Sequence, residues 1–519
     1  GGAAMDAPGR VDRRLVERLR EHLQATSTLP VKLVETHISW LLLGDTTAYK
    51  IKKPVRLPFL DFSTLHARRH FCEEELRLNR RQAGALYLGI TRITGSVDAP
   101  ALDGAGPAIE YAVRMQRFAD GSLLADHARA GTLAARDIDR LAERLAALHD
   151  AAPVAGADSG YGSPARRRSA ALAALDGAAA LAPPRYRAEL DALRRWLAAE
   201  ADRLEPRWRA RVAAGRVREG HGDLHLANVV LLDDEPVPFD AIEFDPALRW
   251  IDVVDDAAFV VMDLFAHERR DLGWRFLDAW LAHAGDHAAL PLLRHAIVYR
   301  ALVRAQVGLL RERQGATPEG PGPAAYLDVA LHVAQAAADA RLAIAHGLPG
   351  AGKSQVARQL LERAGALRLR SDVERKRLFG LAALDDSGGA IYAADATERT
   401  YARLAALARE ALAAGLRVIV DAAFLRRAER DAFAALAREC GVPFAILDCR
   451  APLALLRERV AARHARRDDA SEADLAVLER LAVAAEPLAA DEQAAALAVD
   501  TSRPVDIDAL AHAWLARSA

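Results

Sequence analysis

The sequence predicts two successive folds in one chain. The N-terminal half is expected to be two-lobed, with a small β-rich lobe and a large helical lobe. The C-terminal half is expected to be an α/β domain with a doubly wound parallel sheet. Three observations predict this: strand-like apolar runs gather near the start, alanine-rich helical stretches follow from Gly121 onward, and after position 340 apolar runs alternate with helices.

Composition limits the class of protein. The 519 residues include 70 basic and 71 acidic side chains, for a net charge of −1, so nothing demands a polyanionic partner such as duplex DNA. The three cysteines, Cys72, Cys440 and Cys449, have no disulfide or metal-ligand spacing. No apolar run reaches the roughly 18 residues that span a bilayer. We therefore expect a cytoplasmic protein with no membrane partner and leave its oligomeric state open.

The small lobe is expected to follow a helical extension over residues 1–29. Apolar residues at four-residue steps over 11–24 predict an amphipathic helix. The lobe itself, residues 30–118, should begin with three strands and end with a strand that leads into the large lobe, residues 119–335. These four strands are expected at 31–34, 39–43, 47–51 and 113–118.

The third of these strands carries lysines in a chain that otherwise uses arginine. Only 6 of the 70 basic residues are lysines, at 32, 50, 52, 53, 353 and 376, which leaves 64 arginines. A rare lysine is expected where a compact ammonium group is required. Lys50 and Lys52 share one face of the strand, and either could bind ATP phosphates and pair with a helix glutamate. We favour Lys50 with Glu74 as its partner; a solvated basic edge strand is the alternative.

The segment His221–Asn228, HGDLHLAN, predicts a catalytic loop. Asp223 and Asn228 are five positions apart, as in a kinase catalytic loop. Two apolar runs then flank a turn near Asp234 and predict a hairpin that brings Asn228 and Asp240 side by side. Their oxygens could share Mg²⁺ on ATP, while Asp223 would accept the proton of a substrate hydroxyl. Ordinary turn chemistry is the alternative.

These motifs make residues from about 30 to 335 resemble the aminoglycoside phosphotransferase-like kinases, which have a bilobal protein-kinase-like fold. The resemblance rests on HGDLHLAN and on the FDAIEF segment that contains Asp240. It implies that Asp223 is the catalytic base and that Asn228 and Asp240 hold the metal. The family also has a structural aspartate that supports the catalytic loop, and we assign that role to Asp255.

The C-terminal half begins with a phosphate-binding loop. An apolar run at 342–345 leads into GLPGAGKS, residues 347–354, which a helical stretch follows. Glycines let backbone N–H groups converge on an anion at a helix N-terminus. Lys353 would reach the ATP phosphates and Ser354 would hold Mg²⁺. The expected ATP-binding residues of this loop are Gly347, Gly350, Gly352, Lys353 and Ser354.

Five apolar runs in this half predict a parallel sheet, at 342–345, 366–369, 416–420, 444–447 and 496–499. Polar residues at the carboxyl ends of such strands surround the ligand. Asp421 is expected to hold Mg²⁺, and Asp372 to act as the base or, alternatively, as a helix N-cap. Arg375 and Lys376 could grip an anionic acceptor. Arg463, on an arginine-rich helix, could belong to a lid over the phosphoryl group or to a solvated face.

Residues 340–519 resemble P-loop small-molecule and polynucleotide kinases, including zeta-toxin-like members, through GLPGAGKS, Leu369–Asp372 and the strand that ends at Asp421. The tandem order resembles bacterial fusions of a phosphotransferase-like domain with an AAA-annotated kinase. The resemblance implies an ATP- and Mg²⁺-dependent kinase with two centres that phosphorylate hydroxyl groups of a small metabolite, sugar or nucleotide. Two alternatives remain: one half regulates the other, or the C-terminal half is a polynucleotide 5′-end kinase, which the neutral charge disfavours.

Overall fold

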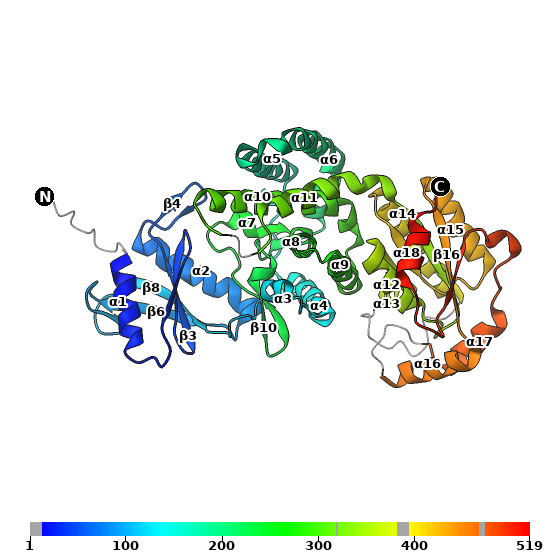
Figure 1. Cartoon of the computed structure of the whole chain (residues 1–519), viewed down its shortest axis with the longest axis horizontal. Helices are drawn as coiled ribbons and strands as arrows, with labels where there is room; N and C mark the ends of the chain where they lie inside the picture. The colour runs from blue at the N-terminus through cyan, green and yellow to red at the C-terminus, as the bar shows by residue number, and fades with distance from the viewer. Residues whose placement is uncertain (1–12, 318–319, 381–393, 467–472) are drawn as a thin grey trace. The chain divides into compact units, whose positions relative to one another are not determined.

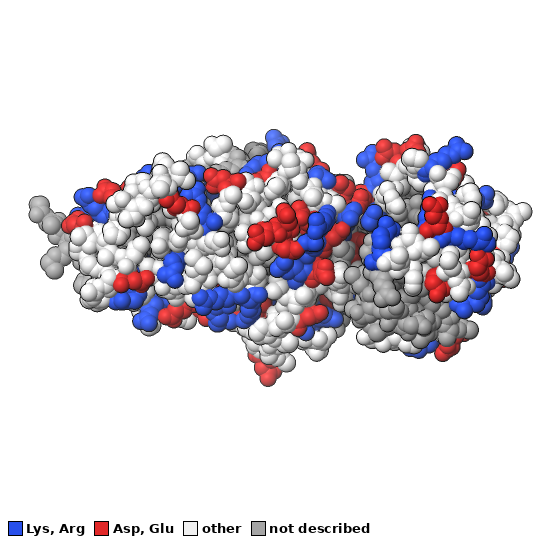
Figure 2. Space-filling model, turned by 90° about the horizontal axis from the view of Figure 1, so that it is seen from below, with Lys and Arg blue, Asp and Glu red and all other residues white. Residues whose placement is uncertain are grey.

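The computed structural model describes residues 13–317, 320–380, 394–466 and 473–519 (Figure 1). Contacts divide the chain into two compact units. The first unit comprises residues 1–137, 151–163 and 209–256, and the second comprises 138–150, 164–208 and 257–519. Among the described residues, no helix is long and apolar enough to cross a membrane. Basic and acidic side chains are interspersed over the face shown in Figure 2.

The first unit is built on a six-stranded antiparallel sheet with the order β1-β2-β3-β8-β6-β7. The predicted strands form close to their expected positions, and the sheet also contains a pair that we did not predict, β6 and β7. The strands are β1 (Lys32–Glu35), β2 (Ser39–Leu43), β3 (Thr47–Lys52), β6 (Tyr87–Gly95), β7 (Pro100–Leu102) and β8 (Glu110–Gln116).

Two helices cover opposite faces of this sheet. The amphipathic helix α1 (Arg13–Gln24) buries Leu15 and Leu19 against Ile51 and Trp40; residues 11 and 12 lie outside the described part of the chain. Helix α2 (Leu65–Ala83) packs on the other face, beside β6 and β8. Successive side chains of a strand point to opposite faces of the sheet. Ile51 points to α1, so its neighbours Lys50 and Lys52 point to α2.

The predicted hairpin is present after the catalytic-loop segment. A short helical turn, η2 (Leu226–Asn228), leads into β10 (Val229–Leu232), which pairs with β11 (Glu235–Pro238). The register places Val229 opposite Pro238, so Asn228 and Asp240 flank the open end of the hairpin. A second short pair, β9 (Val217–Glu219) with β12 (Trp250–Asp252), holds the two ends of this region together.

Long helices make up the segment before the catalytic-loop segment and the segment between the hairpin and the C-terminal sheet, as the sequence predicts. Helices α10 and α11 have the most extensive contacts among them, and both are rich in buried alanine, leucine and valine. The helices are α4 (Ala135–Ala151), α5 (Pro164–Leu181), α6 (Arg187–Ala213), α8 (Val253–Ala266), α9 (Arg270–Ala284), α10 (Leu290–Arg313) and α11 (Pro323–Gln335).

All five predicted C-terminal strands form one parallel sheet with the order β14-β15-β13-β16-β17. They are β13 (Leu342–His346), β14 (Leu367–Arg370), β15 (Val418–Asp421), β16 (Phe444–Arg450) and β17 (Ala496–Asp500). The central strand β13 is buried throughout, which is typical of a sheet with helices on both faces. The order reverses beside β13, where a doubly wound sheet places its ligand.

Helices on both faces bury this sheet. On one face, Ile419 and Leu447 share an apolar cluster with α12 (Lys353–Ala364), α16 (Leu453–Arg466) and α18 (Ile507–Leu515). Helices α14 (Ala394–Ala413) and α15 (Arg427–Cys440) contact the sheet as well as each other. Helices α13 (Ser371–Leu378) and α17 (Leu475–Ala484) lie beyond the strand ends and contribute to the wall of the pocket described below.

Candidate functional site

Both strand lysines of the first unit meet one carboxylate on α2. Lys50 Nζ lies 3.2 Å from Glu75 Oε2 and 2.9 Å from Asp240 Oδ1. Lys52 Nζ lies 2.8 Å from Glu75 Oε1 and 2.5 Å from Glu243 Oε1. Lys52 is 1% exposed, whereas the Lys50 side chain is 17% exposed. Lys50 thus reaches the partly open side of the cluster, beside Asp240, and Lys52 lies deeper in it.

The expected pairing of Glu74 with a strand lysine is not found. Glu74 instead contacts Arg77 and Arg249. The reason is the phase of the helix. The buried stripe of α2 includes Cys72, Glu75 and Leu78, three residues apart on one helical face, so Glu74 points away from β3.

The charges of this cluster stabilise one another. Burial alone would raise the pKa of Glu75, but the ammonium groups of Lys50 and Lys52 lower it well below its usual range. Burial alone would lower the pKa of Lys50, but Asp240 and the two glutamates raise it. Lys50 and Glu75 therefore stay charged at neutral pH, and an ammonium group is maintained on the partly open side of the cluster.

The catalytic-loop residues come together as the sequence predicts. The Asn228 side-chain amide donates to the Asp223 backbone oxygen at 2.9 Å and to Asp223 Oδ2 at 3.3 Å. His225 Nε2 lies 3.5 Å from the same carboxylate. The Asp223 side chain remains 35% exposed, so a substrate hydroxyl could reach it.

The carboxylate that supports this loop is Asp256, not Asp255. The backbone N–H groups of His221 and Gly222 donate to Asp256 Oδ2 and Oδ1 at 2.9 and 3.0 Å. Both residues lie in the first turn of α8, and a shift of one position rotates a side chain by about 100° around the helix. Asp256 is completely buried against the loop, which explains its role.

Asp240 is held in a strained conformation beside the lysines. Its φ angle is 60°, in the left-handed region that non-glycine residues adopt infrequently. Its N–H group donates to the Tyr87 hydroxyl at 3.0 Å, and the next N–H group, of Ala241, donates to Asn79 Oδ1 at 2.9 Å. These two contacts pin the backbone, so the Asp240 carboxylate, with its side chain 39% exposed, faces Lys50.

In the second unit, the phosphate-binding loop has the conformation that its glycines allow. Gly350 and Gly352 have φ angles of 83° and 82°, and a Cβ atom at Gly350 would lie 2.8 Å from the Leu456 carbonyl oxygen. Lys353 Nζ donates to the Leu348 carbonyl oxygen at 3.0 Å. Burial lowers the pKa of Lys353. The loop thus forms a cradle of backbone groups with a lysine folded across it.

Ser354 and Asp421 meet at the carboxyl edge of the sheet. Ser354 Oγ donates to Asp421 Oδ2 at 2.7 Å, which joins the start of α12 to the end of β15. A hydroxyl and a carboxylate oxygen are the donors that Mg²⁺ prefers. The chemistry of this pair therefore fits a metal ion. Among the described residues, no group of three or more histidine, cysteine, aspartate or glutamate side chains forms a self-sufficient metal site.

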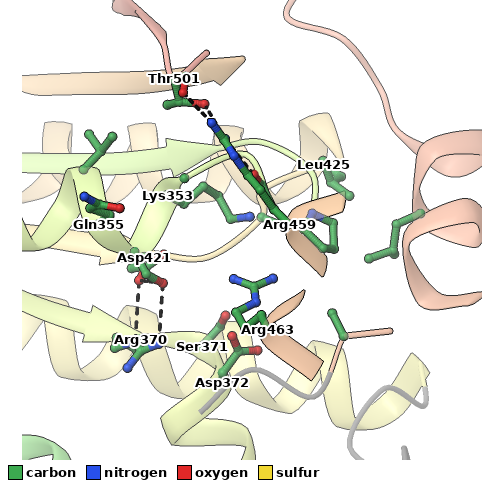
Figure 3. Close-up of a pocket in the computed structure, with 18 of the residues that line it drawn as sticks. Lys353, Gln355, Arg370, Ser371, Asp372, Asp421, Leu425, Arg459, Arg463 and Thr501 are labelled. Carbon is green, nitrogen blue, oxygen red and sulfur yellow. Dashed lines mark hydrogen bonds and ion pairs between the residues drawn. The ribbon is translucent and has the colours of Figure 1, made fainter. Parts of the chain in front are cut away.

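These residues open into a cavity of about 1870 Å³. In Figure 3, Lys353, Asp421, Asp372 and Arg463 point into one space. Arg375 also lines the cavity and donates to Thr397 Oγ1 at 3.2 Å. Lys376, which we expected to act with it, is 1% exposed and does not line the cavity. On a helix, adjacent residues point in different directions, so only Arg375 faces this space.

Three arginines to which the sequence assigned no individual role surround the loop. Arg459 donates to the Gly350 carbonyl oxygen at 3.1 Å and to the Thr501 carbonyl oxygen at 2.6 Å. Arg370 Nε lies 3.6 Å from Asp421 Oδ2 (Figure 3), and Arg368 donates to the Ser354 carbonyl oxygen at 2.9 Å. Among so many arginines, no spacing distinguished these three, because their roles depend on contacts between distant segments.

The fold and the assembled side chains define a chain with two kinase-like parts, one protein-kinase-like and one with a P-loop. Residues 342–488 match the AAA domain family. Uncharacterised proteins of Mycobacterium tuberculosis and Mycobacterium bovis are 32% identical to this chain over 452 residues, which is 84% of this chain and 87% of each relative. The chain belongs to the same family as these mycobacterial proteins.

Solved structures are similar to parts of the chain. A choline/ethanolamine kinase family protein from Mesorhizobium loti is 12% identical, with a TM-score of 0.36, over 62% of this chain and 94% of that one. A sugar kinase from Janibacter sp. is 19% identical, with a TM-score of 0.27, over 34% of this chain and 94% of that one. A gluconokinase from Sinorhizobium meliloti is 21% identical, with a TM-score of 0.25, over 34% and 90%.

Proposed function

We propose that the chain is a bifunctional ATP-dependent phosphotransferase, a kinase with two centres that transfer the γ-phosphate of ATP to alcohol groups. The observation that carries the proposal is that each part holds both a lysine and a candidate metal-binding carboxylate. In the first unit Lys50 lies 2.9 Å from Asp240. In the second unit Lys353 precedes Ser354, which bonds to Asp421. The domain boundaries expected from the sequence, 30–335 and 340–519, are part of this proposal.

In the first centre, Asn228 and Asp240 would hold Mg²⁺ and Lys50 would bind the phosphates. The Asn228 amide nitrogen donates to Asp223, an orientation that leaves its oxygen for a metal. Asp223 would orient the acceptor hydroxyl and accept its proton. Lys52 would hold Glu75 and Glu243 in place without contacting ATP, because it is buried.

In the second centre, Ser354 and Asp421 would hold Mg²⁺ and the loop from Gly347 to Lys353 would bind the phosphates. When bound, the metal would neutralise charge on the transferred group. Asp372 would accept the proton of the hydroxyl acceptor, and Arg463 would lie along the phosphoryl group. Both side chains line the cavity beside Lys353, which supports these assignments.

The test is transfer of labelled γ-phosphate from ATP to three acceptor pools: a metabolite extract, a panel of sugars and nucleosides, and a 5′-hydroxyl oligonucleotide. We expect Asp223→Asn and Lys353→Ala each to abolish one product, because each removes a charge at one centre. Matched controls are Asp234→Asn, in the hairpin turn, and Lys32→Ala, on the exposed start of β1, which should retain both products.

The outcomes separate the alternatives. One product lost in both variants, with an intermediate accumulating in one, would mean sequential chemistry on one metabolite. Loss of transfer in only one variant would make the other half a regulator. Label on the oligonucleotide alone would make the C-terminal half an end kinase. Full turnover of every acceptor by both variants would refute the two-centre proposal.

A further inference from the structure

We propose that Asp278, on α9, is a positioning residue of the P-loop site: it engages the fork of Arg368, so that only one nitrogen of that group lies near Asp421 and the carboxylate stays available for the metal. The proposal rests on the proposed function of the P-loop site. Asp278 precedes the phosphate-binding loop by about 70 residues in the sequence, and both belong to the second compact unit.

The contacts of Arg368 carry the inference. Its Nε and Nη2 atoms donate to Asp278 Oδ1 and Oδ2 at 3.0 and 2.8 Å, as a two-pronged pair. The third nitrogen, Nη1, donates to the Ser354 carbonyl oxygen at 2.9 Å and lies 3.9 Å from Asp421 Oδ2. The side chains of Arg368 and Asp278 are only 8% and 9% exposed. One guanidinium group therefore joins α9 to the first turn of α12, at the edge of the candidate metal site.

The balance of charge explains why this pairing matters. Asp421 already has Arg370 at 3.6 Å, so a second arginine that turned toward it would form a cationic clamp on the carboxylate. A guanidinium group binds a carboxylate through its fork and would compete there with Mg²⁺. The Asp278 carboxylate accepts both hydrogen bonds of the Arg368 fork, so only the third guanidinium nitrogen, Nη1, remains near Asp421.

Asp278 is itself held rigidly relative to the loop. On the same helix, the Arg275 guanidinium donates to Asp139 at 2.8 and 2.7 Å and to Glu362 at 2.9 Å. Glu362 lies near the end of α12, the helix that starts at Lys353. The Trp274 ring packs where α12 ends, and a Cβ atom at Gly365 would lie 3.0 Å from its Nε1. Helix α9 thus contacts the C-terminal end of α12 directly and its first turn through Arg368, which supports the geometry of the fork.

The test measures metal binding in the full-length chain, with Mn²⁺ as the probe, in the presence of ADP and followed by electron paramagnetic resonance. Binding that disappears in Ser354→Ala is assigned to the P-loop site. We expect Asp278→Asn to weaken this affinity by about tenfold, as for residues that orient metal ligands, because Arg368 then turns to Asp421. Asp278→Asn should also raise, by a similar factor, the Mg²⁺ concentration at half-maximal transfer of the product that Lys353→Ala loses.

The double variant Asp278→Asn/Arg368→Gln is the decisive control. It removes the competing charge, so we expect Mn²⁺ affinity to return to within about twofold of the wild type, although its stability stays reduced. Asp271→Asn, at a half-buried carboxylate on the same helix that pairs with Arg269 and not with Arg368, should bind Mn²⁺ as the wild type does. Wild-type affinity in Asp278→Asn, or no recovery in the double variant, would overturn the proposal. If Lys353→Ala loses no product, the proposed function fails, and Mn²⁺ affinity still decides the role of Asp278.

Discussion

Two adjacent glutamates on α2 have different roles because a shift of one residue turns the side chain to another face of the helix. Glu75 is completely buried and contacts both Lys50 and Lys52. Glu74, with 21% of its side chain exposed, pairs with Arg77 and Arg249 at the margin of the cluster. A carboxylate that neutralises two buried ammonium groups cannot be replaced by its partly buried neighbour, which points elsewhere, because the lysines would then be left without a counter-charge.

We therefore expect Glu75→Gln to destabilise the first unit by about 3–5 kcal/mol, the usual cost of removing one partner from a buried ion pair. It should also abolish the product that depends on Asp223. Glu74→Gln is the matched control and should change the free energy of unfolding by less than about 1 kcal/mol. Urea unfolding and phosphate transfer by both variants test this; equal losses in the two variants would contradict the role of Glu75.

At the level of elements, the end of β9 ties α2 to the segment before the catalytic loop. Glu219 is buried and accepts from Arg77 at 3.0 and 3.1 Å and from Arg249 at 3.1 Å, and it also pairs with Arg81. Burial would raise the pKa of Glu219, but the three arginines lower it to about 2. One carboxylate thus gathers three cations from α2 and from the short helix α7 (Pro246–Arg249), which are distant in the sequence.

This lowered pKa predicts a stability that depends on pH. A carboxyl group whose folded pKa lies below its unfolded value, about 4.3, stabilises the fold fully above that value. The contribution is then lost as the pH falls from about 4.3 toward 2. We expect Glu219→Gln to lower the free energy of unfolding by on the order of 2 kcal/mol at pH 7 and by much less near pH 2.5. Urea titrations at several pH values measure this difference, and a deficit independent of pH would contradict it.

Two strands of the first unit have sequence patterns too weak to predict them. The strands β6 and β7 were not predicted because Gly89, Gly95 and Pro100 interrupt their alternation, and these residues usually indicate turns. Pairing with β8 supplies what the local propensity does not. The parallel strands of the second unit were easier to predict, because strands that are buried on both faces appear in the sequence as continuous apolar runs.

On the scale of the whole molecule, the P-loop sheet and α9 form parts of one compact unit. The partners Arg275–Glu362 and Arg368–Asp278 cross between segments that the sequence assigned to separate domains. Trp274 extends the apolar cluster that covers one face of the sheet. The P-loop part of this chain therefore uses residues outside its own motif-bearing segment for support.

A fragment of residues 340–519 should consequently be less stable than the same region in the full chain. Without α9, Arg368 loses its carboxylate partner and the apolar cluster loses the partly buried Trp274, whose burial contributes about 1–2 kcal/mol. Hydrogen exchange in peptides from β13 and α12 measures the change, and we expect faster exchange in the fragment. Equal protection in the fragment and in the full chain would show that the support from α9 is dispensable.

The sequence alone determined the elements whose chemistry is local. The phosphate-binding loop, the catalytic loop from Asp223 to Asn228 and the hairpin that leads to Asp240 each depend on fixed spacings across a single turn. Turn geometry needs only neighbouring residues, so a motif of a few positions predicts it. The order of strands and helices in the C-terminal half followed from apolar periodicity, which is also a property of neighbouring residues.

Only the tertiary structure decided which of several equivalent side chains take part. The rotation of a helix against its neighbours decides which of two adjacent residues faces the site. It selects Glu75 rather than Glu74, Asp256 rather than Asp255, and Arg375 without Lys376. The pairing of Arg368 with Asp278 joins residues 90 positions apart, and no spacing distinguishes one arginine from 63 others. Such contacts depend on how the elements pack, and packing is a property of the assembled chain.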